Sequence, residues 1–203
     1  MTSTTLLAPQ ADPQAEVDER EIALEYVGVS NVLYPVRISG WETRYTEQIK
    51  DAVFTLKVSL EANRRGIHMS RLLEGLHHWQ DSLCPETLPA FLKQMRKSQG
   101  AAEAYLSCAF TWFVKRPTPK TGLPAWQGIE TTWHGRQDSE GSCIGYTLRI
   151  PVTTLCPCSL EISDYGAHSQ RGWVKVKIEW DDGASVVAPE EICLLYTSDA
   201  ADE

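Results

Sequence analysis

The segment from Thr153 to Gly172, TTLCPCSLEISDYGAHSQRG, carries two cysteines, a histidine and an arginine within twenty residues. A thiolate binds a divalent metal tightly, and an imidazole adds a nitrogen ligand. His168 follows Cys156 by twelve residues, which is long enough for a loop to fold back and bring both side chains to one point. The pattern is therefore compatible with a metal site built by Cys156 and His168.

The same residues allow a simpler interpretation. Cys156 and Cys158 are separated only by Pro157, so they can equally be two buried, inert thiols next to a turn. A catalytic zinc-like site has three protein ligands and an open position for water, and a third ligand would have to come from elsewhere in the chain or from another subunit. From the residues alone, both alternatives stay open.

Composition limits the class of protein. The chain has 203 residues, with 19 Lys and Arg against 27 Asp and Glu, a net charge of −8. This charge argues against a general nucleic-acid binder, which needs a basic face. The first residues do not form a secretory signal, and no apolar run is long enough to span a membrane. The six cysteines are scattered, which favours a reducing, cytoplasmic location without disulfides.

Hydrophobic periodicity predicts an α+β fold. Apolar residues alternate with period two, as expected for strands, over five segments: 31–38, 53–60, 104–114, 144–152 and 173–180. Helical spacing covers 70–83, with Ser70 as N-cap, and 87–100, with Thr87 as N-cap and Gly100 at the end. The turn-rich segment 115–128 is interpreted as a loop. We therefore expect an antiparallel sheet with two helices on one face.

The two ends of the chain are interpreted differently from the rest. Residues 1–22 are polar, acidic and proline-containing, which is typical of a disordered tail. The last eleven residues, CLLYTSDAADE (193–203), resemble the translation of a common transposon sequencing adapter. We therefore interpret this segment as an artefact and do not count Cys193 as a ligand.

Three blocks resemble the GTP cyclohydrolase IB family. They are VGVSNVLYPV (27–36), RGIHMSRLLE (65–74) and IPVTTLCPCSLEISDYGAHSQRG (150–172), in the order of the family. The resemblance implies the tunnelling fold (T-fold), a β-β-α-α-β-β unit that forms barrels by oligomerisation. It also implies a first T-fold module at 23–155, and an active-site segment at 156–192 that begins a second, truncated module.

The resemblance also implies roles for individual residues. Cys156 is the metal-linked active-site cysteine, and His168 works beside it as a ligand or proton-transfer group. The role of Cys158 stays undecided. Leu160 departs from the lysine that the family more often has there, which puts in doubt a charge contact at this position but not the metal chemistry.

The substrate contacts implied by the resemblance come from two blocks. His68 lies near the active site, with Ser70 and Arg71 making substrate or interface contacts. Gln170 and Arg171 serve the triphosphate, because a guanidinium fork matches phosphate oxygens.

The implied activity is hydrolytic opening of the guanine ring of GTP, giving 7,8-dihydroneopterin triphosphate and formate, the first step of folate biosynthesis. The implied cofactor is a divalent metal, Mn²⁺ or Fe²⁺ ahead of Zn²⁺, and the implied assembly is a homo-oligomer, a dimer or a tetramer. Two rivals remain: the NADPH-dependent nitrile reductase of queuosine synthesis, which shares the fold, and a non-catalytic module with a closed structural metal site.

Other reactive or aromatic residues receive structural interpretations. We expect inert thiols at Cys84, Cys108 and Cys143, an exposed side chain at His134 on a strand, and tryptophans mainly in the core or at a subunit interface.

Overall fold

The protein is described by a computed structural model that covers residues 13–14, 16–38, 48–118, 121–155, 157–162, 169–181, 189 and 191–193. Six strands and three helices follow one another in these residues. They are β1 (Leu24–Ile38), β2 (Gln48–Leu60), α1 (Met69–Trp79), α2 (Leu88–Gln99), β3 (Ala104–Pro117), β4 (Pro124–Gln137), β5 (Ser142–Leu155), α3 (Pro157–Ile162) and β6 (Ser169–Asp181).

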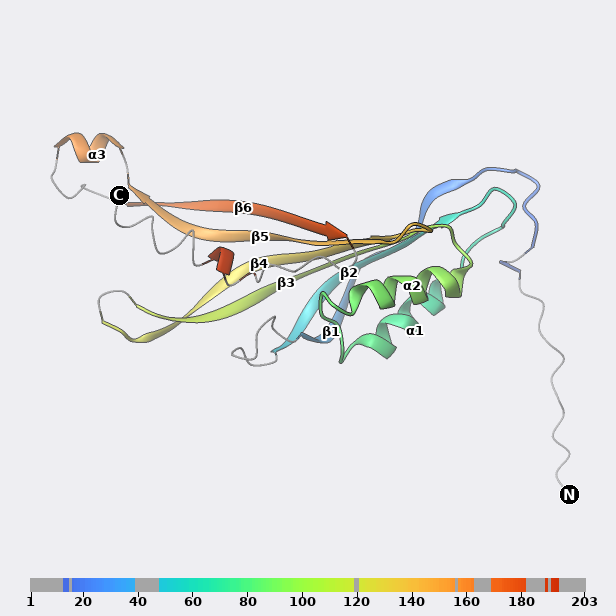
Figure 1. The fold of residues 1–203 in the computed structure, drawn as a ribbon, viewed down its shortest axis with the longest axis horizontal. Helices are drawn as coiled ribbons and strands as arrows, with labels where there is room; N and C mark the ends of the chain where they lie inside the picture. Colours follow the sequence, from blue (N-terminus) through green and yellow to red (C-terminus); the bar gives the residue numbers. More distant parts are fainter. Residues whose placement is uncertain are drawn as a thin grey trace, which may run out of the picture.

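The six strands form one antiparallel sheet in sequence order, β1-β2-β3-β4-β5-β6. Helices α1 and α2 lie together against one face of this sheet (Figure 1). The predicted α+β arrangement of an antiparallel sheet with two helices on one face is therefore confirmed.

The strands are joined continuously at one end of the sheet and separate at the other. β2 pairs with β3 only from Val58↔Ala104 to Val53↔Ala109, and β4 pairs with β5 only from Gln137↔Ser142 to Glu130↔Arg149. The three hairpins β1–β2, β3–β4 and β5–β6 continue beyond these points as two-stranded arms, which fan apart in Figure 1. We call the joined side, with the β4–β5 turn, the continuous end, and the other side the arm end.

Alternation decides which side chains form the core. On β3, Leu106, Cys108, Phe110, Trp112 and Val114 all face the helices and are buried, as the period-two pattern predicted. They belong to one core cluster with apolar residues of both helices, of which Leu72, Leu76, Leu88, Phe91 and Leu92 are the most buried. Burial of each such side chain contributes roughly 1.5–3 kcal/mol to folding.

The helix ends match the sequence in one case and differ in the other. Helix α2 begins after Thr87, has Pro89 in its first turn, and ends at Gly100 with φ 60°, the left-handed conformation that glycine adopts without strain. Helix α1 begins one residue before the predicted cap, so its N-cap is His68 and the prediction for Ser70 was wrong. Neither N-cap side chain makes a capping hydrogen bond.

The loop predicted at 115–128 is shorter than expected. Strand β3 continues to Pro117 and β4 already begins at Pro124, with Pro117 opposite Pro124 at the tip of the arm. The prolines and Gly122 suggested a loop throughout, but they mark only the turn and its two flanks. Residues 124–128 extend β4 and pair with β3. This pairing supplies backbone hydrogen bonds that local sequence preferences do not predict.

In the part of the chain that the structure describes, no helix is both long enough and apolar enough to cross a membrane.

Candidate functional site

The cysteine segment connects the two strands of the β5–β6 arm. Leu155, the last residue of β5, pairs with Ser169, the first residue of β6. Helix α3, which contains the exposed Cys158, lies beyond this pair at the extreme arm end (Figure 1). Cys156 and His168 lie outside the described residues, but each is one peptide bond from the Leu155–Ser169 pair. The sheet register therefore brings Leu155 and Ser169, the described neighbours of these positions in the sequence, to the same end of one hairpin.

Arg171 lies on the face of β6 that is opposite to the helices. It pairs with Thr153 of β5 and is exposed. A cleft of about 270 Å³ adjoins it, lined also by Gln127, Thr153 and Trp173. Gln170 pairs with Thr154 in the adjacent row of the same arm. The predicted triphosphate residues are thus within three positions of the end of the strand that leads to His168.

His68 is held at the other end of the molecule. The Gln99 side chain accepts a hydrogen bond from His68 N at 3.0 Å and donates one to His68 O at 2.9 Å. Gln99 is buried and ends α2 just before β3 begins at Ala104, opposite Gln137 at the continuous end. Sequence reasoning missed Gln99 as a positioning residue, although a glutamine on the buried stripe of a helix is an unusual choice that requires partners.

Ser70 and Arg71 belong to the same region as His68. Ser70 is exposed on the first turn of α1. Nη1 of Arg71 donates to the carbonyl oxygen of Ser98 at 3.3 Å, near the C-terminus of α2. A cleft of about 240 Å³ between α1 and α2 is lined by Arg71, Glu74 and Gln94. These side chains offer polar contacts but contain no metal-binding set.

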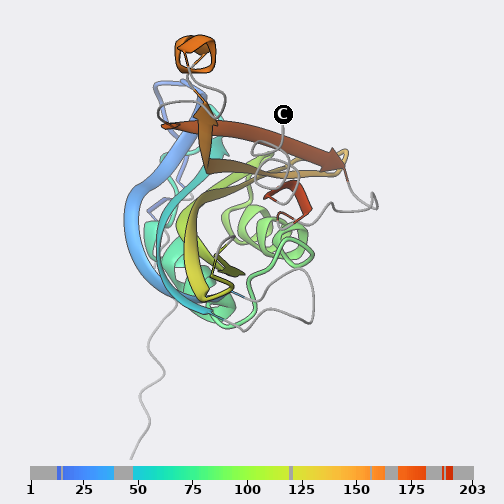
Figure 2. The same cartoon turned by 90° about the vertical axis from the view of Figure 1, so that its left-hand side faces the viewer.

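The candidate residues therefore form two groups that a single chain does not bring together. The fourteen residues of β5 run from the continuous end to the arm end, a length of roughly 40 Å at 3.3 Å per residue. Figures 1 and 2 agree that α3 projects beyond the sheet at a distance from α1 and α2. His68 and Arg71 lie at the first end, and Arg171 lies at the second.

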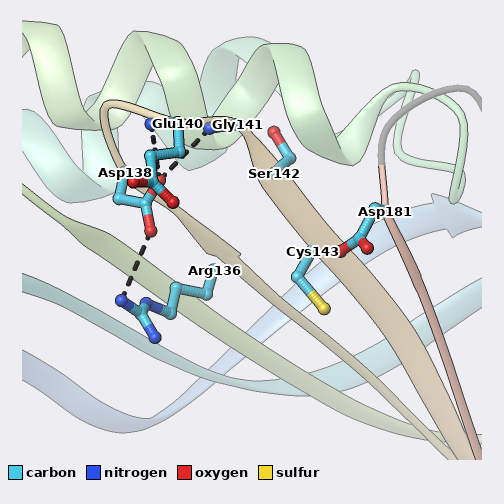
Figure 3. Close-up of a pocket in the computed structure, with 7 residues that line it drawn as sticks. All are labelled: Arg136, Asp138, Glu140, Gly141, Ser142, Cys143 and Asp181. Carbon is cyan, nitrogen blue, oxygen red and sulfur yellow. Dashed lines mark hydrogen bonds and ion pairs between the residues drawn. The ribbon is translucent and has the colours of Figure 1, made fainter.

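A further cleft lies at the continuous end, and Cys143 is one of the residues that line it (Figure 3). Asp138 accepts hydrogen bonds from the backbone N–H groups of Glu140 and Gly141 and from Arg136 at 3.3 Å. The two backbone hydrogen bonds lower the pKa of the Asp138 carboxyl, and the charge of Arg136 lowers it further. The carboxylate is therefore already used to close the β4–β5 turn.

The thiols of Cys84, Cys108 and Cys143 are poorly suited to chemistry. Burial raises the pKa of Cys143, and the neighbouring carboxylates of Asp181 and Glu179 raise it further. Burial also raises the pKa values of Cys84 and Cys108. A thiol with a raised pKa stays protonated at neutral pH and is a weak nucleophile and ligand. The structural interpretation of these three cysteines is supported by their surroundings.

His134 is not exposed, contrary to the sequence prediction. Its side chain is 15% exposed, and Nε2 lies 3.3 Å from Oε1 of Glu179 across β5. The contact is possible because Gly145 lies between them, and a Cβ there would come within 2.5 Å of Nε2. Burial lowers the pKa of His134, against the opposing effect of Glu179. Alternation identified the correct face of the strand, but the glycine on the neighbouring strand decided the burial.

The tryptophans divide between the core and the surface. Trp112 and Trp133 are buried, as expected, whereas Trp126 and Trp173 are more than half exposed on the face opposite to the helices. Each exposed ring carries a cation, Lys115 over Trp126 and Arg149 over Trp173. Among the residues that the structure describes, no group of three His, Cys, Asp or Glu side chains could hold a metal ion.

Comparison with known proteins identifies similar sequences over most of the chain. A family model described as "Type I GTP cyclohydrolase folE2" matches residues 11–203. GTP cyclohydrolase FolE2 of Magnetococcus marinus is 33% identical over 195 residues, covering 93% of this chain and 73% of the relative. The protein of the same name from Desulfosudis oleivorans is 32% identical, covering 92% and 74%. That from Exiguobacterium sibiricum is 38% identical over 167 residues, covering 80% and 54%.

Proposed function

The chain belongs to the type I GTP cyclohydrolase FolE2 family and is a GTP cyclohydrolase, and on this premise we propose that Cys156 and His168 form its catalytic centre. The observation that supports the proposal is the pairing of Leu155 with Ser169 at one end of the β5–β6 arm, since these residues are the sequence neighbours of Cys156 and His168. The finer assignments, to the IB group and to the T-fold, are part of the same proposal. Two expectations about the end of the sequence stay predictions. They are the truncated second module and the adapter origin of residues 193–203.

A divalent metal fits the donor set of this proposed centre. Thiolate and imidazole are ligands for ferrous iron and zinc, and we propose Mn²⁺ or Fe²⁺ ahead of Zn²⁺ from the family resemblance. Cys156 and His168 would hold the ion, with a third donor from another part of the assembly. An ion held there would supply a bound water with a lowered pKa, available as a nucleophile near neutral pH.

The residues of the chain supply the remaining chemistry. Hydration of the guanine ring places a hydroxyl group on C8 and requires a proton at N7. An imidazole titrates near neutral pH, so His168 is suited to deliver that proton. Arg171 and Gln170 hold the phosphate groups on the exposed face of β6. Hydrolysis of the opened ring releases formate, and rearrangement of the ribose leads to 7,8-dihydroneopterin triphosphate.

The position of His68, Ser70 and Arg71 supports a homo-oligomer. These residues lie at the continuous end, roughly 40 Å along the sheet from the cysteine segment. They can contribute to the proposed centre only if a second copy of the chain places its continuous end beside the arm end of the first. We therefore propose a composite site in a dimer or tetramer, located in the cytoplasm.

Formate release from GTP tests the proposed function. Purified full-length protein is stripped of metal, reconstituted separately with Mn²⁺, Fe²⁺ or Zn²⁺, and incubated with GTP. We expect formate and a fluorescent pterin in equal amounts after oxidation of the product. Consumption of NADPH with a nitrile substrate, without formate, would instead identify the nitrile reductase. Loss of folding on removal of the metal, without any turnover, would identify a structural site.

A further inference from the structure

The exposed face of the β5–β6 arm carries an ordered cation that the family resemblance did not assign. Nη1 of Arg149 lies 2.7 Å from Oε1 of Glu130, on the neighbouring strand β4. The guanidinium carbon also lies 4.0 Å from the ring centroid of Trp173 on β6. Arg149 is thus held by contacts from both sides, so its side chain loses less entropy when it binds a ligand.

This cation adjoins the cleft that contains Arg171. Trp173 lines that cleft together with Arg171, Thr153 and Gln127, and its ring is 53% exposed. Arg171 and Trp173 are two residues apart on β6, so they share a face of the sheet. Arg171 makes no ion pair with any residue that the structure describes. Arg171 and Trp173 therefore line one cleft, and the Arg149 guanidinium lies against the ring of Trp173.

The spacing suits a nucleotide whose base lies at the cysteine segment. Trp173 is four residues from Ser169, about 13 Å along the strand, and Arg171 is about 7 Å from it. In a nucleoside triphosphate the ribose and the inner phosphates separate the purine from the terminal phosphate. A purine at Cys156 and His168 would leave its inner phosphates near Arg171 and its terminal phosphate farther along the arm.

We propose that Arg149, positioned by Glu130 and Trp173, binds the terminal phosphate of the GTP substrate and thereby selects a triphosphate over a monophosphate. One N–H of the guanidinium is used by Glu130, and the remaining donors are available for phosphate oxygens. Trp173 is a positioning residue, because its ring fixes the guanidinium plane. The proposal rests on the proposed function, since it takes the base to lie at Cys156 and His168.

Enzyme kinetics of Arg149→Gln measure this contact. We expect KM for GTP to rise about tenfold, the effect of losing one charge-assisted contact of moderate strength, with kcat within about twofold. The competitive inhibition constant of GMP, which lacks the terminal phosphate, should stay unchanged. Arg149→Lys should restore part of the affinity, because it keeps the charge but not the planar fork.

Two further variants separate positioning from structure. Trp173→Phe should behave almost as the wild type, whereas Trp173→Ala should raise KM for GTP without changing the inhibition constant of GMP. Arg136→Gln is the matched control, because Arg136 is similarly exposed and is paired with Glu103 and Asp138 at the continuous end. It should leave both constants unchanged.

The outcomes distinguish this proposal from the proposed function. Suppose that the wild type releases formate. The proposed contact between Arg149 and the terminal phosphate is then wrong if Arg149→Gln leaves KM for GTP unchanged, or if it raises the inhibition constant of GMP by the same factor as KM for GTP. If the wild type releases no formate, it does not consume GTP during a titration. Isothermal titration calorimetry with GTP and with GMP then measures the preference for the triphosphate directly. A wild type that binds both equally then overturns the proposal, and a preference for GTP that Arg149→Gln removes supports it.

Discussion

The two ends of β5 differ in the charged side chains that lie near them. At the continuous end, Cys143 lies beside Asp181 and Glu179, whose charges add to burial in raising the pKa of the thiol. At the arm end, where β5 ends one residue before Cys156, Arg171 and Trp173 line a cleft, and the guanidinium of Arg149 lies over the ring of Trp173. The carboxylates keep the Cys143 thiol protonated at neutral pH, whereas the guanidinium groups of the arm suit an anionic substrate. Burial and neighbouring carboxylates therefore suit Cys143 to a structural role, in contrast to the role that we propose for Cys156.

Replacing the two cysteines gives the largest expected contrast. Cys156→Ser should lower the rate of formate release by about a thousandfold or more, since a catalytic metal contributes several kcal/mol to the transition state. Cys143→Ser should leave the rate within about twofold. Circular dichroism of both variants checks that each is folded. Equal loss of activity in both variants would end the distinction between the two ends.

The two histidines extend the contrast to proton transfer. His168→Gln should lower kcat by a factor on the order of 10²–10⁴, the usual contribution of general acid–base catalysis. His134→Gln should leave kcat unchanged, because His134 lies near the continuous end and faces Glu179. Single-turnover rates of guanine ring opening separate this step from product release. A slow His134→Gln variant with normal His168→Gln kinetics would reverse the assignment.

Substitution of two glycines by alanine measures how tightly the two ends of the sheet are packed. In Gly145→Ala the new Cβ would lie 2.5 Å from the carbonyl oxygen of Ile178, and the overpacking should lower the free energy of unfolding by about 1–3 kcal/mol. In Gly172→Ala, on the arm, the nearest atom would be a methyl group of Val152 at 3.4 Å, an ordinary contact. This variant should unfold at the same urea concentration as the wild type. A destabilised Gly172→Ala with an unchanged Gly145→Ala would show that the arm is the tighter region.

The smallest expected effect is the pH dependence of stability near the continuous end. Burial lowers the pKa of His134 below its ordinary value of 6.5, so the unfolded chain takes up this proton at a higher pH than the folded one. The contribution of His134 is therefore fully present above that value and decreases as the pH falls below it. Urea unfolding between pH 7 and pH 5 should show a smaller decrease for His134→Gln than for the wild type. Identical curves would mean that Glu179 compensates the burial.

Local patterns predicted those parts of the fold that depend on neighbouring residues. The alternation in β3 and β6 and the helical stripe of α2 gave the correct buried faces, and Gly100 marked the end of α2. The loop predicted at 115–128 was too long, because the pairing of β4 with β3 is a long-range effect. The cap at Ser70 was wrong, because Gln99, far away in the sequence, holds the backbone of His68.

The sequence by itself determined the family and the candidate chemistry. The block from Ile150 to Gly172 contains the thiol, the imidazole and the guanidinium within 23 consecutive residues, so the family resemblance can be recognised from the sequence alone. Only the tertiary structure decided how the candidate residues are distributed. Strand register places His68 and Arg171 at opposite ends of the sheet and brings Glu130, Arg149 and Trp173, from three strands, into contact. Such contacts arise from hydrogen bonding between distant segments, and no local pattern of residues encodes them.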